Sequence, residues 1–391
     1  MRILLITTRF PLPPWRGQQV RTVEWLEALA DHERMLICPE PTGTEGPAEL
    51  RANGIDLRFW PGSFLPRIPA ALSGVLRGRP LQESLYATAG ARETARSAMR
   101  EFNPDVAVVQ MVRCAWAVDI VENMSPGVPV VFDAVDSMGL HFENAAADMP
   151  RPLRFPARIE AMRCRDLEVD LSGRAAVTTA VAQRDLDALG VPEGKGLVVP
   201  VAGREPRIAR NPSATPSILL SGNLGYRPTV EAALWFADEV WPGIRESIPS
   251  ARWVLAGARP SRKIRRLSSL PGVEVHADVP DLGPFFAESW VAVAPMETGS
   301  GVPMKVLEAW AAGLPVVAHP WTARGLVEEG RDAVRQAHEV EEWVEAITGL
   351  LGDEGARTDL AAAGRVAWDR SYRPERIAQR IREAVSRAGS Y

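Results

Sequence analysis

The chain has 391 residues, which exceeds what one ordinary hydrophobic core supports and suits two domains of roughly 150 to 200 residues each. Apolar residues make up 46% of it and charged residues 24%, a balance that excludes a disordered or fibrous protein. With 45 basic and 49 acidic residues the formal net charge is -4, so bulk electrostatics do not favour nucleic acid as a partner.

The cysteines and apolar runs limit the compartment and the kinds of site. Cys38, Cys114 and Cys164 are far apart and odd in number, which argues against a disulfide framework and against a metal-ligand cluster. The first apolar run, Ile3 to Ile6, is shorter than a signal-peptide core, and no stretch approaches the roughly 18 apolar residues that span a bilayer. We therefore expect a cytoplasmic protein, a monomer or a homodimer, without a bound metal.

The first half of the chain alternates strand-like and helix-like segments. Residues 1–7 (MRILLIT) form a continuous apolar run, the pattern of a strand buried on both faces of a parallel sheet. A Pro- and Gly-rich turn follows, and then apolar residues recur near helical spacing from Val20 to Leu29. Further strands are predicted at Met35 to Cys38, Asp105 to Val109, Val128 to Phe132, Ala176 to Thr179 and Gly196 to Val201.

The second half repeats this scheme after a polar connection at Arg204 to Pro216. SILLS reads as a new first strand, GNLGYRP as its turn and TVEAALWFADEVWPGI as a helix. Later strands are predicted at Arg252 to Ala256, Val273 to His276, Ser289 to Pro295 and Leu314 to His319. The expected fold class is α/β, with two Rossmann-like doubly wound parallel-sheet domains facing a cleft.

The expected boundaries follow the polar connection. Residues 1–203 form the first domain and 204–370 the second, and the final helix, within 371–391, is expected to pack back on the first domain. Ligands in such folds bind at the carboxyl ends of the strands, where helix N-termini point. The loops that follow strands are therefore the places to look for chemistry.

The densest candidate is ETGSGVPMKVLEAWAAGLPVVAH, residues 297–319. Gly299, Ser300 and Gly301 follow a strand and form a Gly-rich turn, continued by Val302, before a helix that begins near Pro303. Backbone amides of such a turn and the positive end of the helix suit a diphosphate.

Two charged residues lie in the first turns of this helix. Lys305 is a cation where the helix dipole disfavours one, so its presence indicates an anion nearby. Glu308 lies one turn further on the same face, and its carboxylate can accept two hydrogen bonds from a ribose diol. A solvated Lys–Glu pair over a structural turn is the alternative interpretation.

The stretch GSGVPMKVLEAWAAGLPVVA resembles the donor-site signature of family-4 GT-B glycosyltransferases, especially bacterial exopolysaccharide-type sugar transferases. The segments MRILLITTRFPLPPWRGQQVRT, GNLGYRPTVEAALWFADEVWPGI and PGVEVHADVPDLGPFF resemble the same group in the same order, so the similarity spans nearly the whole chain. It implies a nucleotide-sugar donor such as a UDP- or GDP-sugar, an acceptor hydroxyl, retention of anomeric configuration, and neither a cofactor nor a catalytic metal.

The resemblance also implies roles for particular residues. Glu308 matches the acid that holds the nucleotide ribose, and Lys305 and Arg227 match the cations that face the diphosphate. The family's first motif acid, eight residues before Glu308, is replaced by Ser300, which leaves the donor-sugar contact without its usual carboxylate. Glu297 is the candidate that supplies one from another position, and a plain loop acid is the alternative.

In the first domain the candidates follow the first and the fourth of the predicted strands. Gly17 lies in the turn after the first strand, where a residue without a side chain lets the backbone approach a phosphate or an acceptor; an ordinary Pro-Gly turn is the alternative. Asp133, Asp136 and His141 follow the strand that ends at Phe132. The resemblance favours Asp136 as the residue that orients or deprotonates the acceptor hydroxyl, and capping of the next helix is the alternative.

Two further features keep both a functional and a structural interpretation. His319 follows the last strand of the second half and is within reach of the phosphates, although a hydrogen-bonded structural histidine is the commoner case. The Arg-rich stretch Arg77 to Arg100 is either a surface for weak peripheral association with anionic membranes or a solvated helix, and its acids favour the second.

Three other functions compete with glycosyl transfer. A GT-B nucleotide-sugar epimerase shares the architecture and needs no acceptor. A non-catalytic nucleotide-sugar-binding partner subunit is compatible with Ser300 in place of the acid. An NAD-dependent Rossmann oxidoreductase is disfavoured because neither first-strand turn reads GxGxxG.

Overall fold

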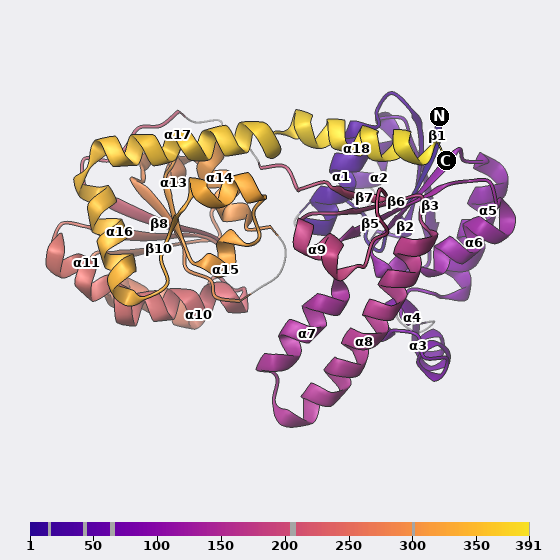
Figure 1. The fold of residues 1–391 in the computed structure, drawn as a ribbon, viewed down its shortest axis with the longest axis horizontal. Helices are drawn as coiled ribbons and strands as arrows, with labels where there is room; N and C mark the ends of the chain where they lie inside the picture. The colour runs from indigo at the N-terminus through magenta and orange to yellow at the C-terminus, as the bar shows by residue number, and fades with distance from the viewer. Residues whose placement is uncertain (15–16, 42–44, 63–66, 204–208, 299–301, 391) are drawn as a thin grey trace. The chain divides into compact units, whose positions relative to one another are not determined.

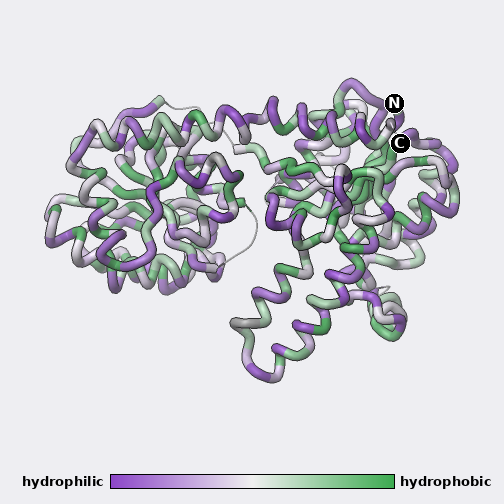
Figure 2. Tube along the Cα trace, viewed as in Figure 1, coloured by the Kyte–Doolittle hydropathy of each residue, from purple (hydrophilic) through white to green (hydrophobic). Residues whose placement is uncertain are grey.

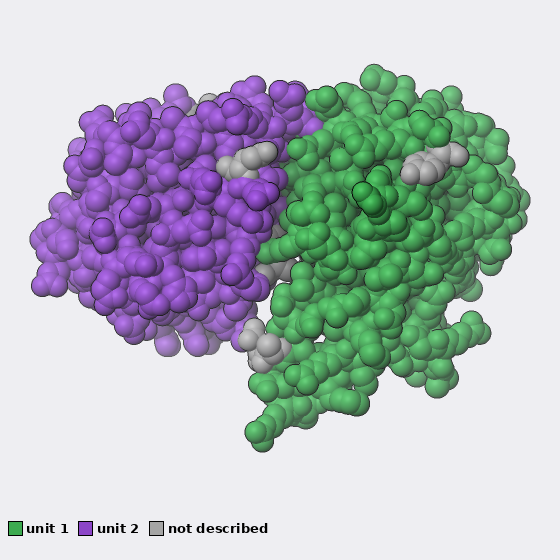
Figure 3. All heavy atoms as spheres, in the orientation of Figure 1, with its two compact units in different colours: residues 1–201, 377–391 green, residues 202–376 purple. Residues whose placement is uncertain are grey.

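The computed structural model describes the whole chain except residues 15–16, 42–44, 63–66, 204–208, 299–301 and 391. The chain divides into two compact units, which Figure 3 colours separately: residues 1–201 with 377–391, and residues 202–376. The division lies next to the boundary expected at residue 203. The acceptor and donor roles expected for the two units remain predictions.

The first unit is built on a seven-stranded parallel sheet with strand order β3-β2-β1-β4-β5-β6-β7. The strands are β1 Arg2–Ile6, β2 Glu33–Pro39, β3 Ile55–Trp60, β4 Val106–Gln110, β5 Val130–Val135, β6 Val177–Ala180 and β7 Gly196–Val198. Their apolar runs form the buried centre of the unit (Figure 2), as continuous hydrophobic stretches do in parallel sheets.

The predicted strands of this sheet are present, with differences at three places. β5 extends to Val135, three residues beyond the predicted end. β7 ends at Val198, three residues before its predicted end. β3 is absent from the prediction because Asp56 and Arg58 interrupt its apolar residues; it is an edge strand with one face towards solvent, which tolerates charges.

Ten helices pack around this sheet or extend from it in the described part of the chain. They are α1 Gly17–Ala28, α2 Glu45–Ala52, α3 Arg67–Leu76, α4 Leu81–Ser84, α5 Ala89–Phe102, α6 Trp116–Met124, α7 Met138–Asp148, α8 Arg151–Arg174, α9 Gln183–Ala188 and α18 Pro374–Ala388. Figure 1 shows α7 and α8 as a helical hairpin that projects from the sheet, with α3 and α4 on the same side of the unit.

The last helix, α18, completes the first unit although the second unit separates it in sequence from β7. Its apolar side buries Ile377, Ile381 and Val385. On its polar side, Arg380 donates to the Val198 carbonyl oxygen at 2.7 Å, and Arg382 donates to the carbonyl oxygen of Ala28 at 2.8 Å. These bonds attach the helix to the end of β7 and to α1.

The second unit is built on a six-stranded parallel sheet with strand order β10-β9-β8-β11-β12-β13. The strands are β8 Ser217–Asn223, β9 Arg252–Ala258, β10 Val273–Ala277, β11 Val291–Ala294, β12 Val316–Ala318 and β13 Arg335–Gln336. The two parallel sheets confirm the predicted α/β class. β13 was not predicted, because two exposed polar residues carry no strand pattern.

Both faces of the second sheet are covered by helices. These are α10 Arg227–Trp235, α11 Trp241–Ser247, α12 Arg262–Arg266, α13 Gly283–Glu288, α14 Met304–Ala311, α15 Pro320–Ala323, α16 Val340–Gly352 and α17 Glu354–Ser371. Alternate residues of β8 show the two layers, because Ile218 and Leu220 join the core on one face and Leu219 joins the core on the other. None of the described helices is both long and apolar enough to cross a membrane.

The helix predicted from TVEAALWFADEVWPGI is continuous but not uniform. A single π-helical turn, Phe236–Val240, separates α10 from α11. Pro242 lies at the start of α11, and a proline ring clashes with the carbonyl group four residues earlier in a regular α-helix. The wider π turn accommodates this proline without ending the helix.

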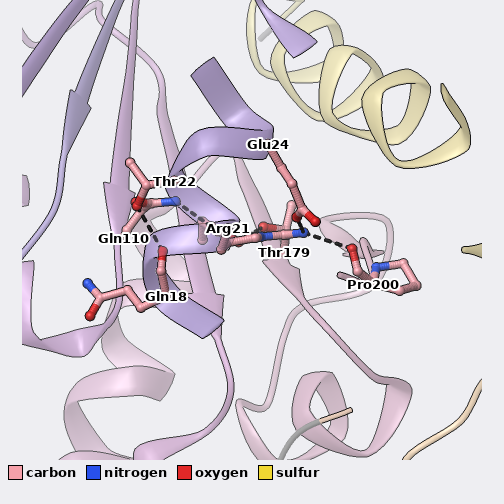
Figure 4. Close-up of polar contacts among 8 residues, drawn as sticks. Gln18, Arg21, Thr22, Glu24, Gln110, Thr179 and Pro200 are labelled. Carbon is pink, nitrogen blue, oxygen red and sulfur yellow. Dashed lines mark hydrogen bonds and ion pairs between the residues drawn. The ribbon is translucent and has the colours of Figure 1, made fainter. Parts of the chain in front are cut away.

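A buried ion pair joins the elements at the carboxyl edge of the first sheet, and Figure 4 labels its arginine, Arg21, together with Thr179 and Pro200. Arg21 of α1 and Asp133 of β5 are both fully buried, and Arg21 Nη2 donates to Asp133 Oδ1 at 2.9 Å. Gln110 of β4 and Thr179 of β6 also donate to this carboxylate, at 3.0 and 2.7 Å. Arg21 Nη1 donates at 3.0 Å to the carbonyl oxygen of Pro200, after β7.

This network corrects the expectation that Asp133 follows the strand and faces a ligand. Asp133 lies within β5, and its carboxylate is already bound by three side chains. A charge buried at this depth is tolerated only when it is paired and hydrogen-bonded, and removing one partner leaves the other uncompensated. Arg21 and Asp133 therefore act in the architecture of the sheet edge.

We predict that Arg21→Met and Asp133→Leu each lower the free energy of unfolding by about 3 to 5 kcal/mol, because each leaves one buried charge without its partner. The double variant should lose less than the sum of the two, since both charges are then gone. Urea unfolding measures these values. Arg58→Met is the control, because its ion pairs are exposed and should contribute at most about 1 kcal/mol. Equal effects of Arg21→Met and Arg58→Met would contradict the prediction.

Candidate functional site

Lys305 lies in the first turn of α14, beside the carboxyl ends of the central strands of the second sheet. Its Nζ is 3.5 Å from Thr229 Oγ1 of α10 and 3.1 Å from Met296 Sδ, just after β11. Gly222 of β8 has a φ of 114°, which favours glycine, and a Cβ there would lie 3.8 Å from the Lys305 Cε. One ammonium group is thus enclosed by elements from three parts of the second unit.

The partners of the Lys305 ammonium group in these contacts are a hydroxyl and a thioether, both neutral and the second a weak acceptor. Burial lowers the pKa of Lys305 to about 8, and the negative charge of Glu308 opposes this shift. An anion placed against this group would favour its charged form and raise the pKa again. The electrostatics therefore suit a site that receives a negatively charged ligand.

The start of α14 adds backbone donors beside Lys305. The helix begins at Met304, one residue after the predicted start at Pro303, and Pro303 offers no side-chain cap. No acid occupies its first turn. Among the described residues the start of α14 therefore has neither a capping side chain nor an acidic side chain to stabilise it. Val302 and Pro303 form the half-buried approach to the helix.

Glu308 lies one turn after Lys305 on α14 and is half-buried. This placement agrees with the predicted arrangement of the two residues on one face. Gly299, Ser300 and Gly301, the predicted phosphate turn, lie outside the described residues. Their roles remain predictions.

Arg227 opens α10, the helix whose Thr229 contacts Lys305. Its side chain is exposed, and its Nε forms an ion pair with Glu231 Oε1 at 2.7 Å, one turn further along α10. An exposed pair of this kind contributes little free energy, so an incoming phosphate can compete for the guanidinium group. The structure therefore places both predicted cations at the amino ends of neighbouring helices.

Met296 connects the Lys305 region with the loop after β12. Thr322 Oγ1 donates to the Met296 carbonyl oxygen at 2.8 Å. His319, which begins this loop, accepts a hydrogen bond at Nδ1 from the Trp321 backbone N–H at 3.1 Å, so the proton of the neutral ring lies on Nε2. His319 Nε2 is buried and has no hydrogen-bond partner among the described residues. Burial lowers the pKa of His319, which keeps the ring neutral.

Glu297 is exposed and lies on the same edge of the sheet. It lines a cavity of about 180 Å³ together with Pro228, Glu231, Ala232, Trp235, Pro295 and Thr298. Its charge opposes the lowering of the pKa of His319, which indicates that the two side chains are near each other. Whether Glu297 replaces the missing motif acid remains a prediction.

In the first unit, Asp136 follows β5 immediately after a strained residue. Val135 has a φ of 66°, which is rare for a β-branched side chain. Ser137 caps α7 by accepting a hydrogen bond from the Leu140 backbone N–H at 3.1 Å. Ser137 therefore caps the helix. The capping role that was the alternative interpretation of Asp136 belongs to this neighbouring residue. Burial raises the pKa of Asp136, and the charges of His141 and other cations oppose the shift.

Two carboxylates beside Asp136 are absent from the predicted site. Glu168 of α8 accepts hydrogen bonds from Ser137 Oγ at 2.9 Å and from the Met138 N–H at 2.7 Å. Asp185 of α9 accepts one from the Ser137 N–H at 3.3 Å. The pKa of Glu168 is raised to about 7 and that of Asp185 to about 6, chiefly by burial, and the charge of Asp136 contributes to both shifts. The three groups therefore share fewer than three negative charges near neutral pH.

One of these carboxylates has a signal in the sequence. Glu168 lies next to Leu167 and three residues before Leu171, two apolar positions on the buried face of α8. An acid within such a helical apolar pattern is exceptional and points to a buried, partnered carboxylate.

Gly17 and His141 occupy the ends of helices near this edge of the first sheet. Gly17 is the exposed first residue of α1, and a Cβ there would meet no atom within 4 Å. The protein itself therefore gives no steric reason for glycine, and the space beside it is open. His141 lies in the first turn of α7, with its ring against Phe142. No group of three or more metal-binding side chains occurs among the residues that the structure describes.

The structure thus gathers the predicted residues into two sets. Lys305, Glu308, His319, Glu297 and Arg227 lie at one edge of the second sheet. Asp136 and His141 lie together after β5 in the first unit, and Gly17 lies at the start of α1.

Comparisons with known proteins concern the family and the fold of the chain. Residues 215–353 match the family described as glycosyl transferases group 1. No curated protein sequence matches the chain at a significant level. The matched segment contains Lys305, Glu308 and Arg227.

Solved structures of sugar transferases share the fold over the full length. A sucrose-phosphate synthase from Thermosynechococcus elongatus aligns over 99% of this chain and 98% of the other, with a TM-score of 0.71 and 15% identity. HepE from Anabaena, solved with UDP, aligns over 99% and 100%, with a TM-score of 0.68 and 14% identity. A glycosyltransferase from Rickettsia africae aligns over 98% of both chains, with a TM-score of 0.63 and 12% identity. The shared fold is GT-B.

We predict that Lys305 titrates with a midpoint near pH 8, measured by NMR on protein labelled at the lysine Cε carbons, because burial disfavours the ammonium form. Inorganic pyrophosphate should move this midpoint upward, since a bound anion favours the charged lysine.

The chain has only two other lysines, Lys195 and Lys263, which serve as internal references. Loss of one signal in Lys305→Met assigns the resonance. An ordinary lysine midpoint, unchanged by pyrophosphate, would show that Lys305 does not hold an anion.

Proposed function

We propose that this chain, a glycosyltransferase of the GT-B fold, transfers a sugar from a nucleoside diphosphate sugar to an acceptor hydroxyl with retention of anomeric configuration. The observation that carries the proposal is the half-buried Lys305, whose ammonium group contacts two neutral acceptors among the described residues beside the start of α14. The UDP and UDP-glucose complexes of HepE, which has this fold, support a nucleotide-sugar ligand. A UDP- or GDP-sugar is the proposed donor.

In the proposed mechanism the bond between the anomeric carbon and the phosphate oxygen breaks first. Its electron pair goes to the diphosphate, where Lys305, Arg227 and the first amides of α14 stabilise the added charge. The acceptor oxygen then bonds to the anomeric carbon on the face that the diphosphate leaves, which gives retention, and its proton passes to Asp136. Charge is neutralised by side chains and amides, so the proposal requires no metal.

Two further residues of the second unit have proposed roles in holding the donor. Glu308 accepts hydrogen bonds from the two ribose hydroxyls, a role that suits a half-buried carboxylate one turn from Lys305. His319 donates its Nε2 proton to a donor phosphate, because that proton has no partner in the described residues. A neutral donor of this kind keeps its proton over the physiological pH range.

Asp136 is the proposed residue on the acceptor side. Its raised pKa places its proton exchange closer to neutral pH than that of an ordinary aspartate, which suits a group that orients or deprotonates a hydroxyl. Burial maintains this shift against the opposing charges of His141, Arg113 and Arg184. Since the three cysteines are free and buried, a reducing compartment such as the cytoplasm is the proposed setting.

The reaction type is tested by supplying UDP- and GDP-sugars with a panel of alcohol acceptors and analysing the product by NMR. We expect a glycoside with the same anomeric configuration as the donor, together with free nucleoside diphosphate. An inverted product would contradict retention. Release of nucleotide with an epimerised free sugar and no glycoside would identify an epimerase, and binding of the donor without turnover would identify a non-catalytic subunit.

We predict that Lys305→Ala lowers turnover roughly 30- to 1,000-fold, which corresponds to about 2 to 4 kcal/mol of lost stabilisation in the transition state. The reason is that the charge on the departing diphosphate would lose its closest cation. Lys263→Ala, which removes an exposed lysine of α12, is the matched control and should leave turnover unchanged. Equal turnover of Lys305→Ala and wild type would remove the central residue from the mechanism.

A further inference from the structure

Helix α3 is apolar but packs into no core. None of its residues is buried, and its exposed side chains include Leu72 at 62% and Leu76 at 86%. Ile68 and Val75 of the same helix are also exposed. An apolar surface of this extent on a globular protein indicates a binding surface rather than chance.

A second exposed apolar group lies at the start of α8. Leu153 and Phe155 are exposed to 55% and 71%, and they lie among Arg151, Arg154 and Arg158. Figure 1 shows that the hairpin of α7 and α8 projects on the same side of the first unit as α3, and Figure 2 shows hydrophobic residues along α3.

One side chain of α8 contacts the segment that follows α3. Glu160 of α8 accepts hydrogen bonds from the backbone N–H groups of Leu81 and Gln82, at 2.9 and 2.8 Å. These amides begin α4, which follows α3 directly, so the bonds fix the α3–α4 segment against α8. Glu160 is itself five residues after Phe155. We call the exposed residues of α3 and of the start of α8 the apolar-basic surface.

Arginine is concentrated in the two segments that form this surface. Residues 67–80, which include α3, contain three arginines and no acid, and one of them, Arg79, pairs with Asp119. Residues 149–159 contain three arginines and no acid, and Glu160 follows them. The protein as a whole carries a net charge of -4, so this concentration of arginine is local. Arginine beside exposed leucine and phenylalanine is the combination that binds the boundary of an anionic bilayer, with the apolar groups in the acyl region and the cations at the headgroups.

We propose that the apolar-basic surface docks the first unit onto a membrane containing anionic lipid. A second copy of the chain fits less well, because a two-fold dimer through this surface would bring arginines against arginines. This proposal does not depend on the proposed sugar transfer.

The structure also refines which part of the Arg-rich region takes this role. On α5, the apolar residues Ala91, Ala95 and Met99 face the core, while Arg96 and Arg100 pair with Glu93. The second half of the stretch from Arg77 to Arg100 is therefore a solvated helix, and the docking surface lies upstream, on α3.

Sedimentation with vesicles tests the proposal. The wild-type protein should bind vesicles of phosphatidylcholine with about a third phosphatidylglycerol and should bind pure phosphatidylcholine vesicles much less. Leu72→Ser with Leu76→Ser should reduce the partition coefficient roughly tenfold or more for each leucine, since each loses its apolar burial. Val366→Ser is the matched control, because it removes a similarly exposed apolar residue from α17 of the second unit.

A second measurement does not depend on the folding of that double variant. The three native cysteines are buried, so Leu76→Cys provides a single accessible thiol for an environment-sensitive dye. Its emission should shift to the blue with anionic vesicles only. The proposal is overturned if anionic vesicles neither bind the protein nor shift the dye, or if Val366→Ser reduces binding as much as the double variant. It is equally overturned if the protein is a dimer that the leucine substitutions dissociate.

Discussion

A charged side chain in a protein interior requires an opposite charge and hydrogen-bond partners around it. In the first unit the Arg21–Asp133 pair meets this requirement. The pair joins α1 to β5 and, through Gln110 and Thr179, to the strands on either side. Asp136 follows Asp133 by three residues. The carboxyl ends of the central strands, where ligands bind in parallel α/β folds, are therefore fixed relative to α1 before any ligand is present.

In the second unit the charged group of Lys305 has weaker partners than Arg21 has. Among the described residues Lys305 contacts a hydroxyl and a thioether, which compensate its charge less than a contacting carboxylate would. Arg21 serves architecture because its partners are complete, whereas the weak partners of Lys305 support its proposed role in binding an anion. The completeness of the partners likewise distinguishes Asp133, which has a structural role, from Asp136, which is a candidate site residue.

Prediction from sequence succeeded where local pattern carried the information. Apolar runs gave most strands, and the spacing of Lys305 and Glu308 gave their common face on α14. It failed for Asp133, because Arg21 lies 112 positions away and no local pattern reports such a pair. The clustering of Glu168 and Asp185 around Ser137 was missed for the same reason, since three separate helices supply it. β3 was missed because an edge strand can carry charges that hide its alternation.

The position of α18 has a consequence for synthesis on the ribosome. The first 201 residues leave the exit tunnel long before Ile377 and Ile381 are made. The apolar surface of the first unit against which α18 packs must therefore stay exposed while the second unit folds. A nascent chain at that stage offers a hydrophobic surface to chaperones. Expression of the amino-terminal unit alone would therefore require residues 377–391 to be fused to it or supplied as a peptide.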